Sequence, residues 1–150
     1  MEKVLDIVLV REKIGRGVKS NYRIVIPELV LERLGLLQTE TAKIIKGGTM
    51  TIPRYIAFKK KSEDVQLVKI VAGTSAKKMY HFMGLAKIGV KGRICLPRNV
   101  VAFFNIANGD YLKLVELKKS DIRLRKVHVE HYYVPKTVLK PIANTKTPSN

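Results

Sequence analysis

The chain repeats itself at a spacing of 70 residues, and this internal repeat constrains the fold more than any other feature of the sequence. Residues 22–27 (YRIVIP) correspond to residues 92–97 (GRICLP), and the correspondence continues without a gap as far as Ile44 and Leu114. One copy of about 45 residues cannot bury a sufficient core by itself. We therefore expect the two copies to share one core.

Upstream of these segments the spacing between the copies changes. Lys13-Ile14-Gly15 recurs as Lys87-Ile88-Gly89, but in the first copy this triplet lies four residues farther from the following arginine. The sequence therefore predicts that the turn before the first Arg-Ile strand is four residues longer than the turn before the second.

Each copy begins with a pattern that predicts a strand followed by a two-turn helix. Residues 23–26 and 93–96 are short runs of β-branched and apolar residues, which are typical of strands. Proline follows each run and favours the start of a helix, which predicts helices over 28–34 and 98–104. Gly35 and Asn105 are suited to the left-handed residue that ends a helix. The sides expected to face the core carry Leu29, Val30 and Leu34 in the first helix, and Val100, Phe103 and Phe104 in the second; Cys95 is expected to be a small core residue.

Further strands are predicted after each helix. In the first copy they cover 42–46 and 49–52 around a Gly-Gly turn, and in the second they cover 111–117 and 122–127 around the turn at 119–121. With the strand upstream of each arginine, one copy reads as strand, strand, helix, strand, strand.

These predictions divide the chain into four parts. Residues 1–58 form the first repeat, 59–83 a connecting hairpin and linker, 84–127 the second repeat, and 128–150 a basic, proline-containing tail that we expect to be extended. The connecting hairpin, with strands predicted at 55–58 and 65–71, is expected to extend the sheet, and Gly73–Ala76 is expected to be the joint between the halves.

The order of arginine strand, proline, short helix ending in Leu-Gly, and then Gly-Asp and a strand resembles the AbrB-type swapped-hairpin (SpoVT/AbrB-like) DNA-binding family, with tandem repeats as in MraZ-like regulators. The second copy, KIGVKGRICLP followed by NIANGDYLKLVEL, is the closer match. The resemblance implies a mainly β fold with short helices, in which two tandem ββαββ repeats interleave their hairpins into one β-barrel. The barrel would form within one chain as a pseudo-dimer or between two chains as a homodimer.

The resemblance also implies double-stranded DNA as the partner, bound by basic side chains near the strands and their loops. The arginine that opens the family's strand matches Arg23 and Arg93, and the basic position of the first strand matches Lys13 and Lys87. The family's regulators often have an arginine pair in the short helix. This chain has Leu31-Glu32 and Val101-Ala102 at those positions, so the resemblance does not imply that contact.

Charge gives an independent argument for a polyanionic partner. The chain has 29 Lys and Arg against 12 Asp and Glu, a net charge of +17. No carboxylate occurs between Asp64 and Asp110, although this window holds seven basic residues. A solvated surface stabilised by ion pairs would need both signs of charge in the same region. The uneven distribution therefore favours binding to nucleic acid over a merely hydrated lysine-rich surface.

Basic residues near the two arginine strands are the candidate DNA contacts. Lysine neutralises phosphate, and arginine can in addition donate two hydrogen bonds to guanine or to a phosphate. For Arg23 and Arg93 a structural ion pair with a turn carboxylate, Glu40 or Asp110, is the alternative. The candidates are Arg11, Lys13, Arg16, Lys19, Arg23, Lys87, Lys91, Arg93 and Arg98.

No motif indicates catalysis or a cofactor. The sequence has no nucleophile elbow, no glycine-rich phosphate loop and no paired-histidine zinc motif, and His128, Glu130 and His131 lack a fourth metal ligand. Neither a signal peptide nor a membrane span is predicted, so we expect a cytoplasmic, DNA-associated protein. The predicted function is sequence-specific or semi-specific binding of double-stranded DNA, as a transcriptional regulator. The alternatives are an architectural DNA-coating protein and a protein-interaction module, such as an antitoxin or an inhibitor of a nucleic-acid machine.

Overall fold

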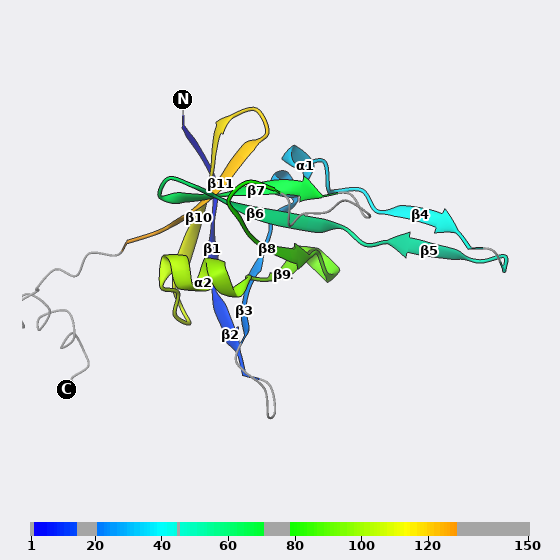
Figure 1. Cartoon of the computed structure of the whole chain (residues 1–150), viewed down its shortest axis with the longest axis horizontal. Helices are drawn as coiled ribbons and strands as arrows, with labels where there is room; N and C mark the ends of the chain where they lie inside the picture. Colours follow the sequence, from blue (N-terminus) through cyan, green and yellow to red (C-terminus); the bar gives the residue numbers. More distant parts are fainter. Residues whose placement is uncertain (1, 15–20, 45, 71–78, 129–150) are drawn as a thin grey trace, which may run out of the picture.

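The chain is mainly β-structure with short helices, as the sequence predicts, in a computed structural model that describes residues 2–14, 21–44, 46–70 and 79–128 (Figure 1). Two helices, α1 (Glu28–Arg33) and α2 (Arg98–Phe104), each follow one of the arginine strands. The strands are β1 (Lys3–Leu9), β2 (Arg11–Lys13), β3 (Asn21–Val25), β4 (Glu40–Lys43), β5 (Thr49–Ile52), β6 (Tyr55–Lys61), β7 (Asp64–Ile70), β8 (Phe82–Lys87), β9 (Arg93–Cys95), β10 (Tyr111–Lys118) and β11 (Asp121–Lys126).

The largest sheet has six antiparallel strands in the order β1-β10-β11-β7-β6-β8. Two hairpins, β10–β11 and β6–β7, meet at its centre. Each hairpin is flanked on its outer side by a strand from the other half of the chain: β1 pairs with β10, and β8 pairs with β6. In Figure 1, β1, β10 and β11 run nearly vertically while β6 and β7 run nearly horizontally, which reflects the strong twist of the sheet.

A second sheet, β2-β3-β9, joins the two arginine strands to each other. Ile24 lies opposite Ile94, and on either side of this pair Arg23 faces Cys95 and Val25 faces Arg93. Residues that are 70 positions apart therefore occupy equivalent places on β3 and β9. A local two-fold axis passes between the two isoleucines.

Backbone hydrogen bonds around this axis follow the same spacing. The Ile26 N–H donates to the Gly92 carbonyl, and the Leu96 N–H donates to the Tyr22 carbonyl. The distance from nitrogen to oxygen is 2.8 Å in both hydrogen bonds. The correspondence between residues 22–36 and 92–106 is thus a correspondence of local structure as well as of sequence.

The two helices begin and end as the sequence predicts, within one residue. α2 covers the predicted 98–104, and α1 ends one residue before the predicted end at 34. Gly35 and Asn105 have φ of 73° and 51°, the left-handed conformation expected after a helix. Leu29, predicted to face the core, is 42% exposed, because successive residues of a helix are rotated by about 100° and the buried side is the one carrying Val30, Leu31 and Leu34.

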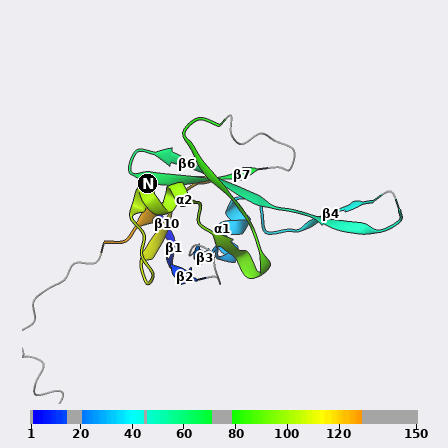
Figure 2. The ribbon, with the colours of Figure 1, turned by 60° about the horizontal axis from the view of Figure 1, so that its bottom comes forward.

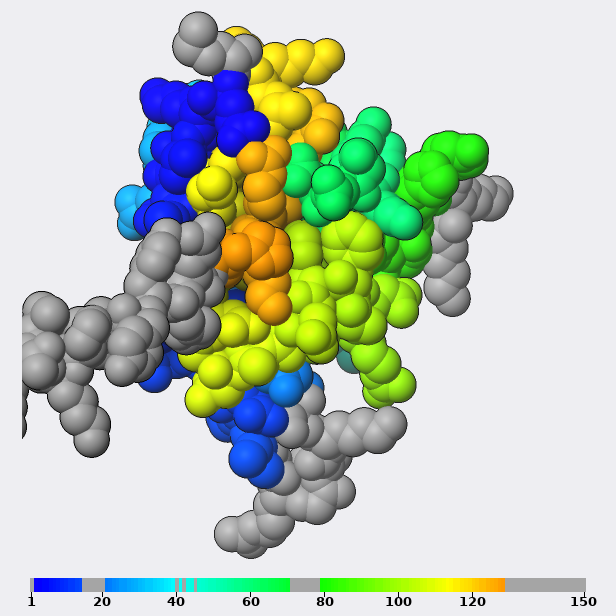
Figure 3. All heavy atoms as spheres, turned by 90° about the vertical axis from the view of Figure 1, so that its left-hand side faces the viewer, coloured from blue at the N-terminus to red at the C-terminus, as the bar shows by residue number. Residues whose placement is uncertain are grey.

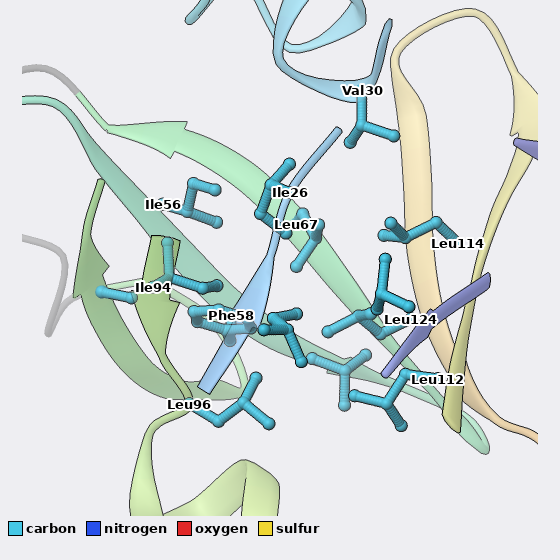
Figure 4. Close-up of a cluster of buried hydrophobic side chains, with 14 of the residues drawn as sticks. Ile26, Val30, Ile56, Phe58, Leu67, Ile94, Leu96, Leu112, Leu114 and Leu124 are labelled. Carbon is cyan, nitrogen blue, oxygen red and sulfur yellow. The ribbon is translucent and has the colours of Figure 1, made fainter. Parts of the chain in front are cut away.

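Side chains from both halves of the chain pack in one hydrophobic core, which Figure 4 shows in part. Branched aliphatic residues dominate it, and Phe58 is its largest fully buried side chain. The core residues labelled in Figure 4 come from both sheets and from α1: Ile26, Val30, Ile56, Phe58, Leu67, Ile94, Leu96, Leu112, Leu114 and Leu124.

The correspondence at a spacing of 70 residues ends after the helices. By that spacing β4–β5 would take the place of β10–β11, but among the described strands β4 and β5 pair only with each other and project from the body in Figures 1 and 2. The hairpin β6–β7 takes the matching place in the large sheet. Burial explains why β6–β7 and not β4–β5 joins the large sheet. Ile56 and Phe58 on β6 fill the core, whereas β4–β5 has threonines at alternate positions. The expected division between residues 58 and 59 falls within β6.

The turns before the two arginine strands differ in length as the sequence predicts. The β2–β3 pairing runs to Lys13 and Asn21, so the first turn covers residues 14–20, whereas the Gly89 N–H donates to the Arg93 carbonyl and the second turn covers residues 90–92. The first turn is therefore four residues longer. Lys13 and Lys87 are not equivalent, because Lys87 ends β8 and pairs with Tyr55 on β6.

Cys95 is exposed rather than buried in the core. Side chains alternate along β9, and the positions that face inward are taken by Ile94 and Leu96, which leaves Arg93 and Cys95 outward. The expected joint at Gly73–Ala76 and all of the tail beyond His128 lie outside the described residues.

Candidate nucleic-acid interface

The outward face of the sheet β2-β3-β9 carries four of the predicted DNA contacts. Alternate residues of a strand point to opposite sides of a sheet. Ile24 and Ile94 are buried on the inner side, so the odd-numbered residues of all three strands face outward. We call this outward surface the basic sheet face and define it by Arg11, Lys13, Arg23 and Arg93.

Arg23 lies at the centre of the basic sheet face. Arg11 is directly opposite it on β2, and Arg93 is its diagonal neighbour on β9. The Arg23 Nε atom is buried and has no hydrogen-bond partner among the described residues. Like charges facing each other across a strand pair and an unsatisfied buried donor both lower stability. An anion bound on this face would relieve the charge repulsion.

The basic sheet face is concave. All four of its basic side chains line one open cleft with a volume of about 720 Å³. Five apolar residues line the same cleft: Val8, Leu9, Ile24, Val25 and Pro27. Two carboxylates, Asp6 and Glu12, also line the cleft, but within the described part of the chain neither is within ion-pairing distance of a basic side chain. The cleft therefore combines a net positive charge with free hydrogen-bond donors.

Elsewhere in the molecule arginines are held by carboxylates. Arg125 donates two hydrogen bonds to Asp64, at 2.8 and 3.0 Å, and Arg123 donates two to Asp121, at 3.1 and 3.2 Å. Gln66 also donates to Asp121, at 3.0 Å, so the group joins the hairpin β6–β7 to β11. The Arg125 guanidinium lowers the pKa of Asp64. The hydrogen bonds to Asp121 raise the pKa of Arg123, and the hydrogen bonds to Asp64 raise the pKa of Arg125. These two arginines are structural.

The structural ion pair considered for Arg23 and Arg93 does not form with Asp110. One Asp110 oxygen accepts the Ala107 N–H at 2.8 Å and lies 3.5 Å from the Lys126 ammonium. The side chain of Glu40, the other carboxylate considered, is outside what the structure describes. Instead Arg33, on α1, pairs with the buried Glu116 at 2.6 Å, an interaction that could not be predicted from the sequence.

The remaining predicted DNA contacts lie elsewhere on the molecule or outside the described residues. Lys91 is exposed in the turn before β9 and lines a neighbouring hollow beside α1. Lys87 and Arg98 are exposed at the end of β8 and at the start of α2, and neither lines the cleft. Arg16 and Lys19 belong to the segment between β2 and β3 that lies outside the described residues.

A second group of basic side chains surrounds a hollow of about 950 Å³ between α2, β11 and the turn from β6 to β7. Figure 3 shows this side of the molecule, with α2 in lime, β11 in orange and the turn in blue-green. The Lys60 ammonium lies 5.5 Å from the centre of the Phe103 ring, and Lys113 and Lys126 line the same hollow. Sequence reasoning missed this group because its members come from separate elements that only the sheet topology brings together.

No protein-family model, curated protein or solved structure matches this chain significantly. Among the described residues, no set of three or more His, Cys, Asp or Glu side chains is arranged to hold a metal ion. The described helices are also too short and too polar for any of them to cross a bilayer.

Proposed function

We propose that this protein binds double-stranded DNA, with sequence specificity or partial specificity, and acts as a transcriptional regulator rather than as an enzyme. The observation that carries the proposal is the basic sheet face. Four basic side chains converge there on one cleft, and none of the four forms an ion pair within the described residues.

The chemistry of this face suits a duplex. Lys13 and the arginines can neutralise successive phosphates, which provides affinity that does not depend on sequence and weakens as salt rises. Arginine can in addition donate two parallel hydrogen bonds to the guanine edge in the major groove, which provides discrimination between bases. Arg11, Arg23 and Arg93 give the face three such groups on neighbouring strands.

We further propose that the fold is an AbrB-type swapped-hairpin arrangement made within one chain. Two features support it: β1 and β8 each flank the hairpin of the opposite half, and the local two-fold axis relates β3 to β9. In this arrangement β6–β7 and β10–β11 are the equivalent hairpins, and β4–β5 is an insertion in the first repeat. The chain would then act as an intramolecular pseudo-dimer.

An architectural role in coating DNA is the second candidate, and the basic hollow beside α2 is the observation that favours it. That hollow adds Lys60, Lys113 and Lys126 on a surface formed by other elements than the basic sheet face. A protein that coats DNA benefits from cations on several sides, whereas a regulator needs one oriented surface.

The first test replaces both symmetry-related arginines. Arg23→Ala combined with Arg93→Ala removes two charges from the basic sheet face and should weaken binding to a labelled duplex about tenfold or more at moderate salt, because each phosphate contact adds to the salt-dependent affinity. Fluorescence anisotropy at two salt concentrations measures both the affinity and its salt dependence.

Lys118→Ala combined with Lys119→Ala is the matched control. These lysines are exposed at the turn between β10 and β11, and their loss removes the same charge from another part of the surface. The control should bind nearly as tightly as the native chain. Equal losses from both double variants would favour the architectural role, and no binding even at low salt would refute DNA binding altogether.

A further inference from the structure

The segment 40–52, which we call the β4–β5 arm, contributes no described residue to the hydrophobic core and none of its described strands to the larger sheets. Its two strands form a separate two-stranded sheet, and Figures 1 and 2 both show it projecting from the body. A two-stranded hairpin without further packing is only marginally stable in water. An arm of this kind gains stability when a partner covers it.

The base of the arm is nevertheless fixed in direction. Arg54, directly after β5, donates hydrogen bonds from Nη1 to the backbone carbonyls of Leu36 and Leu37, just before β4. The guanidinium therefore ties together the two chain segments that enter and leave the arm. A hairpin anchored in this way is presented at a set angle to the body.

The arm has one polar and cationic face. Strand pairing sets Thr41 opposite Thr51 and Lys43 opposite Thr49, and all four side chains are exposed. Hydroxyl and ammonium groups of this kind are common donors to phosphate oxygens. No Asp or Glu occurs from Thr41 to Ser62, so nothing in the strands of the arm beyond Glu40 opposes this charge.

The tip of the arm is a turn that contains glycine. Gly47 adopts a positive φ of 83°, and the Ile44 N–H donates to the Gly48 carbonyl at 3.0 Å to close the turn. Gly47 and Gly48 add no side chains to the tip, and Lys46 is exposed there. The major groove of B-DNA, about 12 Å wide, admits a two-stranded β-ribbon.

We propose that the β4–β5 arm is a second DNA-contact site, which enters a groove of the same duplex with its Thr/Lys face turned toward the nucleic acid. The inference rests on the proposed function, because it assumes that the duplex lies on the basic sheet face. It adds that the footprint on DNA extends on one side beyond the body of the protein, since only the first half of the chain carries an arm.

The opposite face of the arm is apolar and suggests a second copy of the chain as the alternative binding partner. Ile44 and Met50 are 44% and 50% exposed there, and a second copy of the chain could cover them. The lysines favour DNA over a second copy, because two arms with the same net positive charge would repel each other on approach.

The experiment compares the full-length native chain with Lys43→Ala combined with Lys46→Ala. Loss of about two phosphate contacts should reduce the slope of log affinity against log salt by about 1.8, which means that the affinity changes about tenfold less between 50 and 200 mM salt. Hydroxyl-radical footprinting should show protection lost at one end of the site only. Thermal unfolding should not change, because the arm is not part of the core.

Each outcome separates the arm from the basic sheet face. An unchanged salt slope and footprint would overturn the arm proposal while leaving the proposed function intact. Weaker binding by the arm variant but not by the Arg23→Ala, Arg93→Ala variant would overturn the basic sheet face as the main site, and with it the proposal that the arm is a second contact beside that face. Sedimentation that shows a dimer abolished by Met50→Asp, with unchanged DNA binding, would assign the arm to a second copy instead, and a chain that binds no duplex would overturn both proposals.

Discussion

Arg23 is the residue at which stability and the proposed function are opposed. It faces Arg11 across the strand pair, and its buried Nε has no partner among the described residues. Our proposal accounts for these surroundings by a role of Arg23 in binding, because functional sites are commonly less stable than the fold allows.

Arg23→Met should therefore stabilise the protein and weaken its binding to DNA. Methionine keeps the length of the aliphatic stem and removes the unsatisfied donor and the repulsion from Arg11, so the free energy of unfolding should rise by about 1 kcal/mol. Urea denaturation measures the change, and anisotropy with the labelled duplex measures the loss of affinity.

Arg125→Met is the matched control for Arg23→Met. Arg125 donates two hydrogen bonds to Asp64, so its loss leaves a buried carboxylate without its main partner and should lower the free energy of unfolding by about 3 kcal/mol. If Arg23→Met also destabilised the protein, Arg23 would be a structural residue and our description of the basic sheet face would be wrong.

Among the elements, the hairpins β6–β7 and β10–β11 depend on each other through Asp64. This carboxylate begins β7, is largely buried, and accepts hydrogen bonds from Arg125 and Arg123 on β11. The Arg125 guanidinium lowers the pKa of Asp64 below its ordinary value. The ionised form of Asp64 therefore stabilises the junction of the two hairpins.

This junction should make stability depend on pH in the acid range. Because the pKa of Asp64 is lowered on folding, its contribution is complete above the unfolded pKa, about 3.9, and is lost as the pH falls through the lower folded value. Asp64→Asn should lower the melting temperature at pH 7, and the difference from the native chain should shrink as the pH falls below about 4. Glu63→Gln, at the exposed neighbouring position, should change neither; a constant difference for Asp64→Asn down to pH 2 would contradict the assignment.

The sequence predicts the elements better than it predicts their partners. Proline and the left-handed Gly35 and Asn105 are local signals, so the helices and the arginine strands could be located closely. The repeat aligns Ile24 with Ile94, but that these two residues pair with each other was not predicted. The arm could not be predicted, because the 70-residue spacing still aligns its residues with β10. Only burial in the core determines that the hairpin β6–β7, and not β4–β5, joins the large sheet as the counterpart of β10–β11.

The candidate site could also be predicted only where the signals are local to one strand, and not where the contacts depend on tertiary structure. Alternation puts Arg93 and Cys95 on the same side of β9, so the expected burial of Cys95 conflicted with an outward Arg93, and the structure places both outward. The separation of Arg23 and Arg93 from Asp110 was not predictable, because the Ala107 N–H competes for that carboxylate through the local turn. The arginines that do form ion pairs include Arg33 on α1 and Arg125 on β11, and the carboxylates that face them, Glu116 and Asp64, come from elements distant in the sequence.

At the scale of the whole molecule, the two halves are similar but not equal. The first half has the β4–β5 arm and the long connection between β2 and β3, and the second half has tight turns at both places. In the intramolecular pseudo-dimer that we propose, these unequal halves would present an asymmetric surface to DNA.

The protected DNA site should accordingly lack strict two-fold symmetry. We expect a single chain per site, and light scattering of the free protein should give the mass of a monomer, 17.0 kDa. A footprint centred on a perfect palindrome, with two chains bound, would contradict the intramolecular arrangement.

The exchange of outer strands between the halves also sets the order in which the chain can fold. Among the described strands β1 pairs with β10 alone in the large sheet, and Lys3 meets Glu116 there, so β1 leaves the ribosome more than 100 residues before its neighbour. Contacts between residues so distant in sequence slow folding. Until β10 emerges, β1 lacks its pairing partner, and unpaired strand edges of this kind make partly synthesised chains prone to aggregation.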